Sequence, residues 1–262
     1  MPAGPRFERL DDWLDWQQQL HPATIELGLR RIAAVLERTG WTRPRAPVIT
    51  VGGTNGKGSC VALLDAVLRA NGYRVATFTS PHLVDYRERI RIDGAMASEA
   101  SLIAAFERAA DALGPDSLTF FEFNTLAALL IFETAVPDVI VLEVGLGGRL
   151  DSVNVVDPDV AVVVSIGLDH MDWLGPDLES IGREKAGIFR AGRPAVFGTP
   201  EPPRSVRERA QEIGARLQVR GTDFDGRVVG VAGWDFMVGD RVALSALPLP
   251  SLPAPIQVAN AA

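Results

Sequence analysis

The chain has 262 residues, of which 47% are hydrophobic and 23% charged, and its formal net charge at pH 7 is −7. This is ordinary globular composition, without the ~18 uninterrupted apolar residues of a membrane span or the Lys/Arg cluster of a nucleic-acid-binding surface. Because Cys60 is the single cysteine and residues 1–6 lack the apolar core of a signal peptide, we expect a cytoplasmic protein. The negative net charge and the apolar pattern favour small anionic ligands over nucleic acid or membrane as partners.

Two helices are predicted before the first strand, over residues 10–19 and 24–38, where Leu, Ile, Val and Trp recur with helical spacing. Pro22 separates them and suits the opening of the second helix. A buried strand is predicted over 47–51. The apolar stripe from Val61 to Leu68 then indicates a helix.

The following segment alternates between strand and helix patterns. Helices are predicted at 99–113 and 123–135, and continuous Val/Ile runs, which indicate strands buried on both faces, predict strands over 73–79, 138–144, 159–166 and 193–197. This order predicts an α/β fold of three layers, a mostly parallel sheet with helices on both faces. Ligands of such sheets bind beyond the carboxyl ends of the strands.

The pattern changes from about residue 215. Short segments separated by Gly and Asp predict a small antiparallel β region over about 215–246, with strands at 216–220, 227–231, 234–238 and 241–244. The proline-rich stretch 247–253 excludes a central strand or a helix, and 257–262 reads as the first turn of a helix. We therefore divide the chain into N-terminal helices (1–45), a central domain (46–246) and a proline-rich segment with the start of a helix (247–262).

The most informative motif follows the first strand, where residues 52–59 read Gly-Gly-Thr-Asn-Gly-Lys-Gly-Ser. Glycines let backbone N–H groups approach phosphate oxygens, the following helix contributes its positive N-terminal end, and Lys57 adds a point charge. The motif predicts a P-loop that binds a nucleoside triphosphate. A glycine-rich turn without a ligand is the alternative.

Polar residues follow several of the predicted strands. Glu143 ends one of them and could complete the shell of Mg²⁺, although a strand-end salt bridge is the alternative. His170 follows another strand and could be a second metal ligand oriented by Asp169, or a structural histidine. Ser80 also lies at a strand end. Lys185 by itself reads as a solvated helical charge.

Residues 119–123, Thr-Phe-Phe-Glu-Phe, fit a helix start and a pocket for a flat heterocycle equally well. Taken with the other motifs, they resemble the folylpolyglutamate synthase/dihydrofolate synthase family, a branch of the Mur ligases, and especially its bacterial bifunctional type. The segments that carry the resemblance are 21–29, 53–59, 80–83, 119–122, 143–151, 169–170 and 183–188.

The resemblance implies an ATP-dependent ligase that transfers the γ-phosphoryl group to the carboxylate of dihydropteroate or a folate. The amine of L-glutamate then attacks the acyl phosphate, which leaves an amide, ADP and phosphate. Members of the family are mostly monomers, and they continue into a C-terminal domain that binds glutamate, which we expect to be absent from this chain.

The resemblance also implies roles for single residues. Lys57, Glu143, His170 and Lys185 would carry the chemistry, with ATP bound by Asn55, Gly56, Lys57, Gly58, Ser59 and Asn260. Two Mg²⁺ ions would be held by Ser80, Glu143, His170 and Lys185, the lysine as a carbamate derived from CO₂. The pterin pocket would be lined by Thr119, Phe120, Phe121, Glu122, Leu150, Asp151 and Ser152.

Two other functions remain open. A Mur-type ligase acting on a cell-wall precursor would share the P-loop, although residues 119–122 suit a pterin better. A non-catalytic nucleotide-binding module would bind ATP and Mg²⁺ without turnover.

Overall fold

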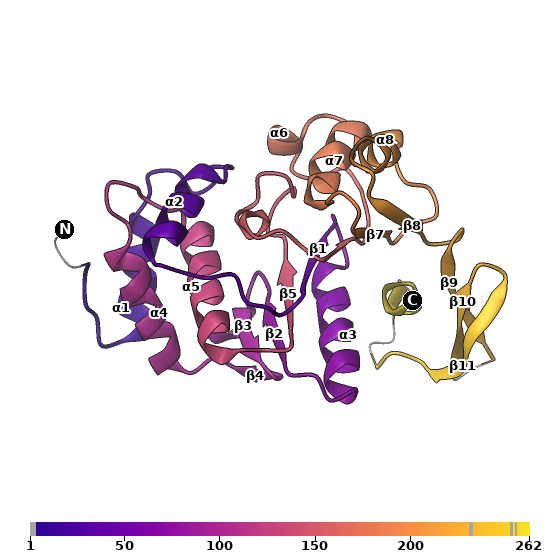
Figure 1. The fold of residues 1–262 in the computed structure, drawn as a ribbon, viewed down its shortest axis with the longest axis horizontal. Helices are drawn as coiled ribbons and strands as arrows, with labels where there is room; N and C mark the ends of the chain where they lie inside the picture. The colour runs from indigo at the N-terminus through magenta and orange to yellow at the C-terminus, as the bar shows by residue number, and fades with distance from the viewer. Residues whose placement is uncertain (1–3, 231–232, 252–253, 255) are drawn as a thin grey trace.

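The protein is represented by a computed structural model that describes residues 4–230, 233–251, 254 and 256–262. An eight-stranded sheet forms its centre in the order β4-β3-β2-β5-β1-β6-β7-β8 (Figure 1). The strands are β1 (Val48–Gly52), β2 (Val75–Phe78), β3 (Ile90–Ile92), β4 (Ala95–Met96), β5 (Val139–Glu143), β6 (Val160–Val163), β7 (Pro194–Phe197) and β8 (Arg216–Val219). All pairings from β2 to β8 are parallel, whereas β3 and β4 are antiparallel additions at one edge.

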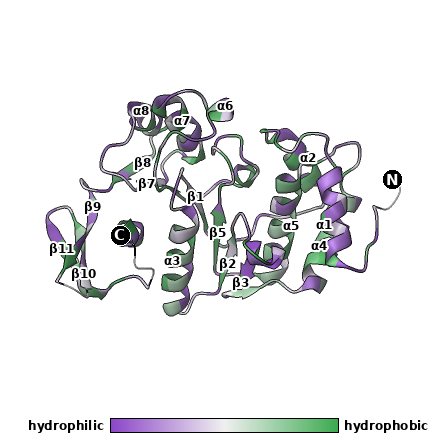
Figure 2. Ribbon diagram, turned by 180° about the vertical axis from the view of Figure 1, so that it is seen from behind, coloured by the Kyte–Doolittle hydropathy of each residue, from purple (hydrophilic) through white to green (hydrophobic). Residues whose placement is uncertain are grey.

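Helices cover both faces of this sheet, as the sequence predicts. They are α1 (Leu10–Gln19), α2 (Arg30–Arg38), α3 (Lys57–Ala70), α4 (Glu99–Asp111), α5 (Phe120–Ala135), α6 (Met171–Leu174), α7 (Leu178–Lys185) and α8 (Arg204–Ile213). In β5, Val139 and Val141 pack in the core under α3, while Ile140 and Leu142 belong to the larger core that includes α5. Because both faces are covered, the central strands carry no polar face, and α5 and β5 are largely hydrophobic in Figure 2.

The second helix begins later than the sequence predicts, at Arg30 rather than at residue 24. The residues before Arg30 have no regular secondary structure, because they form hydrogen bonds that a helix would not make. The Gly28 N–H donates to the Leu150 carbonyl at 3.1 Å, and the Glu26 carbonyl accepts from the Arg31 guanidinium at 2.8 Å. These bonds hold the segment against the rest of the molecule, so α2 is not extended toward the N-terminus by a further turn.

The segment 216–219 was expected in the antiparallel region, and this expectation is wrong. It forms β8, which pairs in parallel with β7 and extends the main sheet. The sequence reading did not identify α8, which supplies the helical crossover that parallel neighbours require. Gly214, with φ +67°, ends that helix and turns the chain into β8.

A separate three-stranded antiparallel sheet follows, made of β9 (Phe224–Val229), β10 (Gly233–Val238) and β11 (Arg241–Pro248). Pro248 ends the edge strand β11, as expected of a residue that has no N–H to donate to a neighbouring strand. Val231 and Pro253, the ends of two expected segments, lie outside the described residues. The last helix, α9 (Ile256–Ala261), lies between α3 and β9 (Figure 1). Across the described part of the chain, no helix combines the length and the apolar character needed to cross a membrane.

Candidate functional site

The glycine-rich turn lies between the end of β1 and the start of α3 and is anchored to the loop after β6. The Thr54 N–H donates to the Ser165 carbonyl at 2.8 Å, and the Asn55 N–H donates to the Ser165 hydroxyl at 3.0 Å. Thr54 also accepts from the Gly167 N–H at 3.0 Å through its hydroxyl. The turn therefore has a fixed conformation, as a phosphate-binding loop requires.

Gly56 is the N-cap residue of α3 and has φ +86°, a backbone conformation that favours glycine. A Cβ at this position would also lie only 3.0 Å from the Val164 side chain. Lys57 opens the helix, and its ammonium group donates to the Gly53 carbonyl at 3.0 Å and the Thr54 carbonyl at 3.3 Å. The cation thus lies directly over the loop, where it can meet an anion.

Helix α9 brings two of the last residues of the chain to this loop. The Gln257 amide donates to the Ser59 hydroxyl at 3.4 Å, and the Asn260 amide donates to the Gln257 side chain at 3.0 Å. A Cβ on Gly56 would lie 3.2 Å from the Asn260 Oδ1. Asn260 is therefore beside the P-loop, where the sequence reading expects it.

Glu143 ends β5 with its carboxylate at the start of α3. The side chain is buried, with a relative exposure of 4%, and accepts the Ser80 N–H at 2.9 Å. A Cβ on Gly58 would lie 3.8 and 3.9 Å from the two carboxylate oxygens. Burial raises the pKa of Glu143, an effect that the Ser80 N–H, Lys57 and Arg89 oppose.

These properties fit Mg²⁺, which prefers oxygen ligands and takes few of them from the protein when phosphates and waters supply the rest. A cation beside Glu143 would compensate for the cost of burying its charge. Within the described ranges, no three His, Cys, Asp or Glu side chains converge as a metal site. The structure thus offers one carboxylate ligand at the P-loop, and the Ser80 backbone already holds it in place.

Ser80, whose N–H holds the Glu143 carboxylate, also lines a cavity of about 300 Å³; Glu143 itself is not part of the lining. The cavity collects polar and apolar side chains from distant parts of the chain. Its lining includes the predicted residues Ser80, Thr119, Phe121, Glu122, Leu150, Asp151, Ser152 and His170. Phe120, which was expected with them, is not in the lining; its ring lies 5.6 Å from the Arg89 guanidinium.

Residues 119–122 form the start of α5, and Thr119, Phe121 and Glu122 among them also line the cavity. The helix start is confirmed, and the pocket for a flat heterocycle stays a prediction. Thr119 is the N-cap of α5: its hydroxyl accepts the Glu122 N–H, and Glu122 accepts the Thr119 N–H at 2.8 Å. Phe121 lies against Gly145, where a Cβ would be 2.5 Å from the ring. The capping box therefore presents Thr119 and Glu122 at the cavity with a defined orientation.

Asp151 is buried at the cavity and accepts the N–H groups of Leu146 at 2.8 Å and Val153 at 3.0 Å. Burial raises its pKa to about 6, against these hydrogen bonds and the charge of Lys57. A carboxyl with this pKa can change its protonation near neutral pH, which suits a hydrogen bond to a polar heterocycle.

Lys185 is buried rather than solvated, with a relative exposure of 4% at the end of α7. Burial, and secondly the charge of Lys57, lower its pKa to about 8, while Asp169 and Asp151 oppose this shift. The loop after β5 lies close to α7: a Cβ on Gly148 would be 3.0 Å from the Lys185 carbonyl. This close approach packs the end of α7 against the loop after β5.

His170 is exposed, with 52% of its side chain accessible. It lies 3.7 Å from the Asp169 carboxylate, has φ +49°, and lines the same cavity as Ser80. A separation of 3.7 Å is longer than a hydrogen bond, so the orientation of the His170 ring by Asp169 stays a prediction.

The sequence analysis assigned no pocket role to several residues that line the cavity. They include the irregular segment from Thr24 to Gly28, together with Arg89, Gly145 and Leu146. The segment 24–28 was assigned to a helix, and its apolar residues gave no signal of a pocket. Arg89 lies in a charged segment after Ser80, and nothing in the sequence distinguishes it there from the neighbouring charged residues.

Comparisons with known proteins agree with this geometry. Residues 51–220 match the family model of the Mur ligase middle domain. A dihydrofolate synthase/folylpolyglutamate synthase of Escherichia coli (strain K12) is 50% identical over 247 residues, which are 94% of this chain and 58% of that protein.

Two solved structures are similar over nearly the whole chain. The structure of E. coli FolC in complex with DHPP and ADP is 49% identical, with a TM-score of 0.92 over 98% of this chain and 62% of that one. A bifunctional folylpolyglutamate synthase/dihydrofolate synthase from Yersinia pestis, complexed with AMPPNP and Mn ion, is 47% identical, with a TM-score of 0.90 and the same coverage. The chain therefore spans about three fifths of the length of these relatives.

Proposed function

Because this chain belongs to the Mur ligase family, we propose that it is the ATP-binding and pterin-binding part of a dihydrofolate synthase/folylpolyglutamate synthase. The reaction joins the carboxylate of dihydropteroate or a folyl(poly)glutamate to the amine of L-glutamate at the expense of ATP. One observation carries the proposal: the P-loop, the buried carboxylate of Glu143 and a cavity of about 300 Å³ are neighbours, because Gly58 lies beside Glu143 and Ser80 both holds Glu143 and lines the cavity. A cavity of this size falls at the lower end of the ~300–1,000 Å³ typical of small-molecule sites.

The polyphosphate would bind along the glycine-rich turn at the start of α3. Residues 55–59 supply N–H groups, and the Lys57 ammonium would turn from the Gly53 and Thr54 carbonyls toward the phosphate oxygens. Asn260 would contact the nucleotide from α9. Phosphoryl transfer depends mainly on positioning and charge stabilisation, and these groups provide both.

Glu143 would hold Mg²⁺, with the Ser80 hydroxyl and His170 as further ligands. The ion supplies charge neutralisation on the transferring phosphoryl group. The carboxylate of the pterin substrate would lie at the Ser80 side of the cavity, in line with the γ-phosphate, while Thr119, Phe121 and Asp151 hold the heterocycle. A carboxylate oxygen of the substrate would attack the γ-phosphorus as its bond to ADP breaks, which gives the acyl phosphate. The glutamate amine would then attack the carbonyl carbon, expel phosphate and lose a proton to solvent, which leaves the amide.

Lys185 would be present as a carbamate. A pKa of about 8 leaves a part of the amine neutral at pH 7, and the neutral amine can attack the carbon of CO₂ while its proton passes to solvent. The product is an anion in place of a cation. It would reduce the repulsion from Lys57 and fix magnesium-bound water.

Calorimetric titration tests the proposal on this chain. The protein should bind ATP only with Mg²⁺, and it should bind dihydropteroate more tightly when the nucleotide is present. Lys57→Met should weaken ATP binding at least about tenfold, since a charge-assisted contact to phosphate is lost. Arg69→Met is the matched control, because it removes a cation from the other end of the same helix, where Arg69 pairs with Asp65.

The outcomes separate the alternatives. Unchanged ATP affinity in Lys57→Met refutes the phosphate site. Binding of a nucleotide-linked cell-wall peptide in place of dihydropteroate identifies a ligase for a cell-wall precursor. ATP binding with neither ligand identifies a nucleotide-binding module and contradicts the pterin assignment.

A further inference from the structure

One wall of the substrate cavity has no regular secondary structure. Residues 24–28 line the cavity, between the end of α1 and the start of α2. A second wall is the N-terminus of α5, with Thr119, Phe121 and Glu122. The distance between these two walls decides how closely a flat ligand is enclosed, so the contacts that join them matter for binding.

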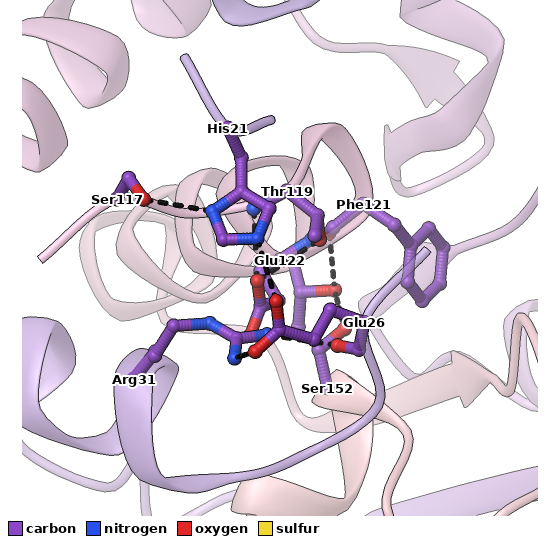
Figure 3. Close-up of polar contacts among 9 residues, drawn as sticks. His21, Glu26, Arg31, Ser117, Thr119, Phe121, Glu122 and Ser152 are labelled. Carbon is purple, nitrogen blue, oxygen red and sulfur yellow. Dashed lines mark hydrogen bonds and ion pairs between the residues drawn. The ribbon is translucent and has the colours of Figure 1, made fainter. Parts of the chain in front are cut away.

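Arg31 makes the connection (Figure 3). Its guanidinium donates to the Glu26 carboxylate and, at 2.8 Å, to the Glu26 carbonyl, so it holds both the side chain and the backbone of the irregular wall. The same guanidinium donates to the Glu122 carboxylate at 3.1 Å. One planar group thus bridges both walls, a geometry that the single ammonium of a lysine does not reproduce.

The partners on both sides are held by other bonds. Glu122 accepts the Thr119 N–H at 2.8 Å and the Thr119 hydroxyl at 3.0 Å, and only 4% of its side chain is exposed. On the other wall, His21 lies 3.0 Å from the Glu26 carboxylate and 2.7 Å from the Ser117 hydroxyl. Arg31 is therefore the link between two groups that are each already oriented.

We propose that Arg31 is a positioning residue for the pterin substrate: it fixes the wall 24–28 against the N-terminus of α5 and thereby sets the affinity of the cavity. Arg31 is absent from the cavity lining, and its hydrogen bonds go to Glu26 and Glu122 and not to the P-loop, so we expect its replacement to leave ATP binding unchanged. The inference rests on the proposed function only for the identity of the ligand, dihydropteroate.

Arg31→Met tests this role, and the chain contains a matched control. Arg38 lies on the same helix and also bridges distant backbone, donating to the Ala112 carbonyl at 2.6 Å and to Asp116 at 2.6 Å. Arg38, Ala112 and Asp116 are all absent from the cavity lining. Arg38→Met therefore removes a comparable bridge without touching either wall.

We expect Arg31→Met to weaken dihydropteroate binding about tenfold, since binding must then order the wall, while the Kd for ATP stays unchanged. Arg31→Lys should fall between wild type and Arg31→Met, and Arg38→Met should bind both ligands as wild type does. An equal loss in both methionine variants, or a parallel loss of ATP affinity, overturns the proposal because either result indicates general destabilisation.

Amide hydrogen exchange gives a test that needs no ligand. In Arg31→Met the amides of residues 24–29 should exchange faster than in wild type, while those of the P-loop should not change. Unchanged exchange at 24–29 overturns the inference. If wild type binds ATP but not dihydropteroate, the proposed function fails, and the exchange result still decides the role of Arg31.

Discussion

Replacing Lys185 by Met should stabilise the protein at neutral pH, although it removes a residue of the site. The lysine is buried, and its pKa falls from 10.5 to about 8, chiefly through burial and secondly through Lys57. The difference of about 2.5 units, at about 1.36 kcal/mol each, corresponds to a destabilisation of about 3 kcal/mol by the buried ammonium group. Met keeps most of the aliphatic packing and has no charge.

The sign of the pH dependence follows from the direction of the shift. Below about pH 8 both the folded and the unfolded chain hold the proton, and the full penalty applies. Between about pH 8 and 10.5 the folded protein has lost the proton that the unfolded chain still holds, so the stability of wild type rises with pH. The advantage of Lys185→Met should shrink from about 3 kcal/mol at pH 7 to about 1.5 kcal/mol at pH 9.5.

Urea denaturation at these two pH values measures the difference, in buffer free of CO₂ so that the amine is not carbamylated. Arg183→Met is the control: it removes an exposed cation from the same helix, and the change in its stability should not depend on pH. A Lys185→Met variant that is less stable than wild type by the same amount at both pH values would refute the reasoning, because burial of the ammonium group would then have no cost.

Three further variants test other parts of the site. Gly56→Ala should lower stability by about 1–3 kcal/mol more than Gly40→Ala in urea denaturation, because both have positive φ but only Gly56 would bring a Cβ to 3.0 Å from Val164. Glu143→Gln should weaken ATP binding in calorimetry and abolish its dependence on Mg²⁺. The melting temperature of the ligand-free variant should be at least that of wild type, because burial raises the pKa of Glu143, so the buried carboxylate destabilises the fold at any pH above the pKa of this group in the unfolded chain. Thr119→Ala should cost about 1 kcal/mol of unfolding free energy through loss of the cap of α5 and should weaken dihydropteroate binding as well.

Local patterns in the sequence were sufficient for the centre of the fold. The Val/Ile run at 139–143 is a strand buried on both faces, and the run at 160–163 is a strand with one face buried and the other half-buried. The turn at 52–59 leads into α3 as predicted. The edge at 216–219 could not be assigned from its own residues, because a short strand has the same pattern in a parallel and an antiparallel sheet. Its partner is decided by α8, whose role as a crossover appears only in three dimensions.

The irregular wall was missed for a different reason. Residues 24–28 carry helical spacing, and local propensity favours continuing α2 backward. Tertiary bonds override it: Arg31 binds the Glu26 carbonyl, and Gly28 bonds to Leu150, more than a hundred residues away. No periodicity encodes such contacts, so the segment that encloses the cavity is the part that a sequence pattern predicts least well.

The charges around the P-loop have a common physical character. Burial raises the pKa of Glu143 and Asp151 and lowers that of Lys185, so each group is displaced toward its neutral form. The ligand-free site thus keeps ionisable groups where water cannot solvate them well, and this arrangement costs stability that a purely structural cluster would not need. A divalent cation favours the ionised carboxylate, so Mg²⁺ bound with ATP would reverse the shift of Glu143. The same burial that weakens the free protein therefore strengthens the interaction of this carboxylate with a bound cation.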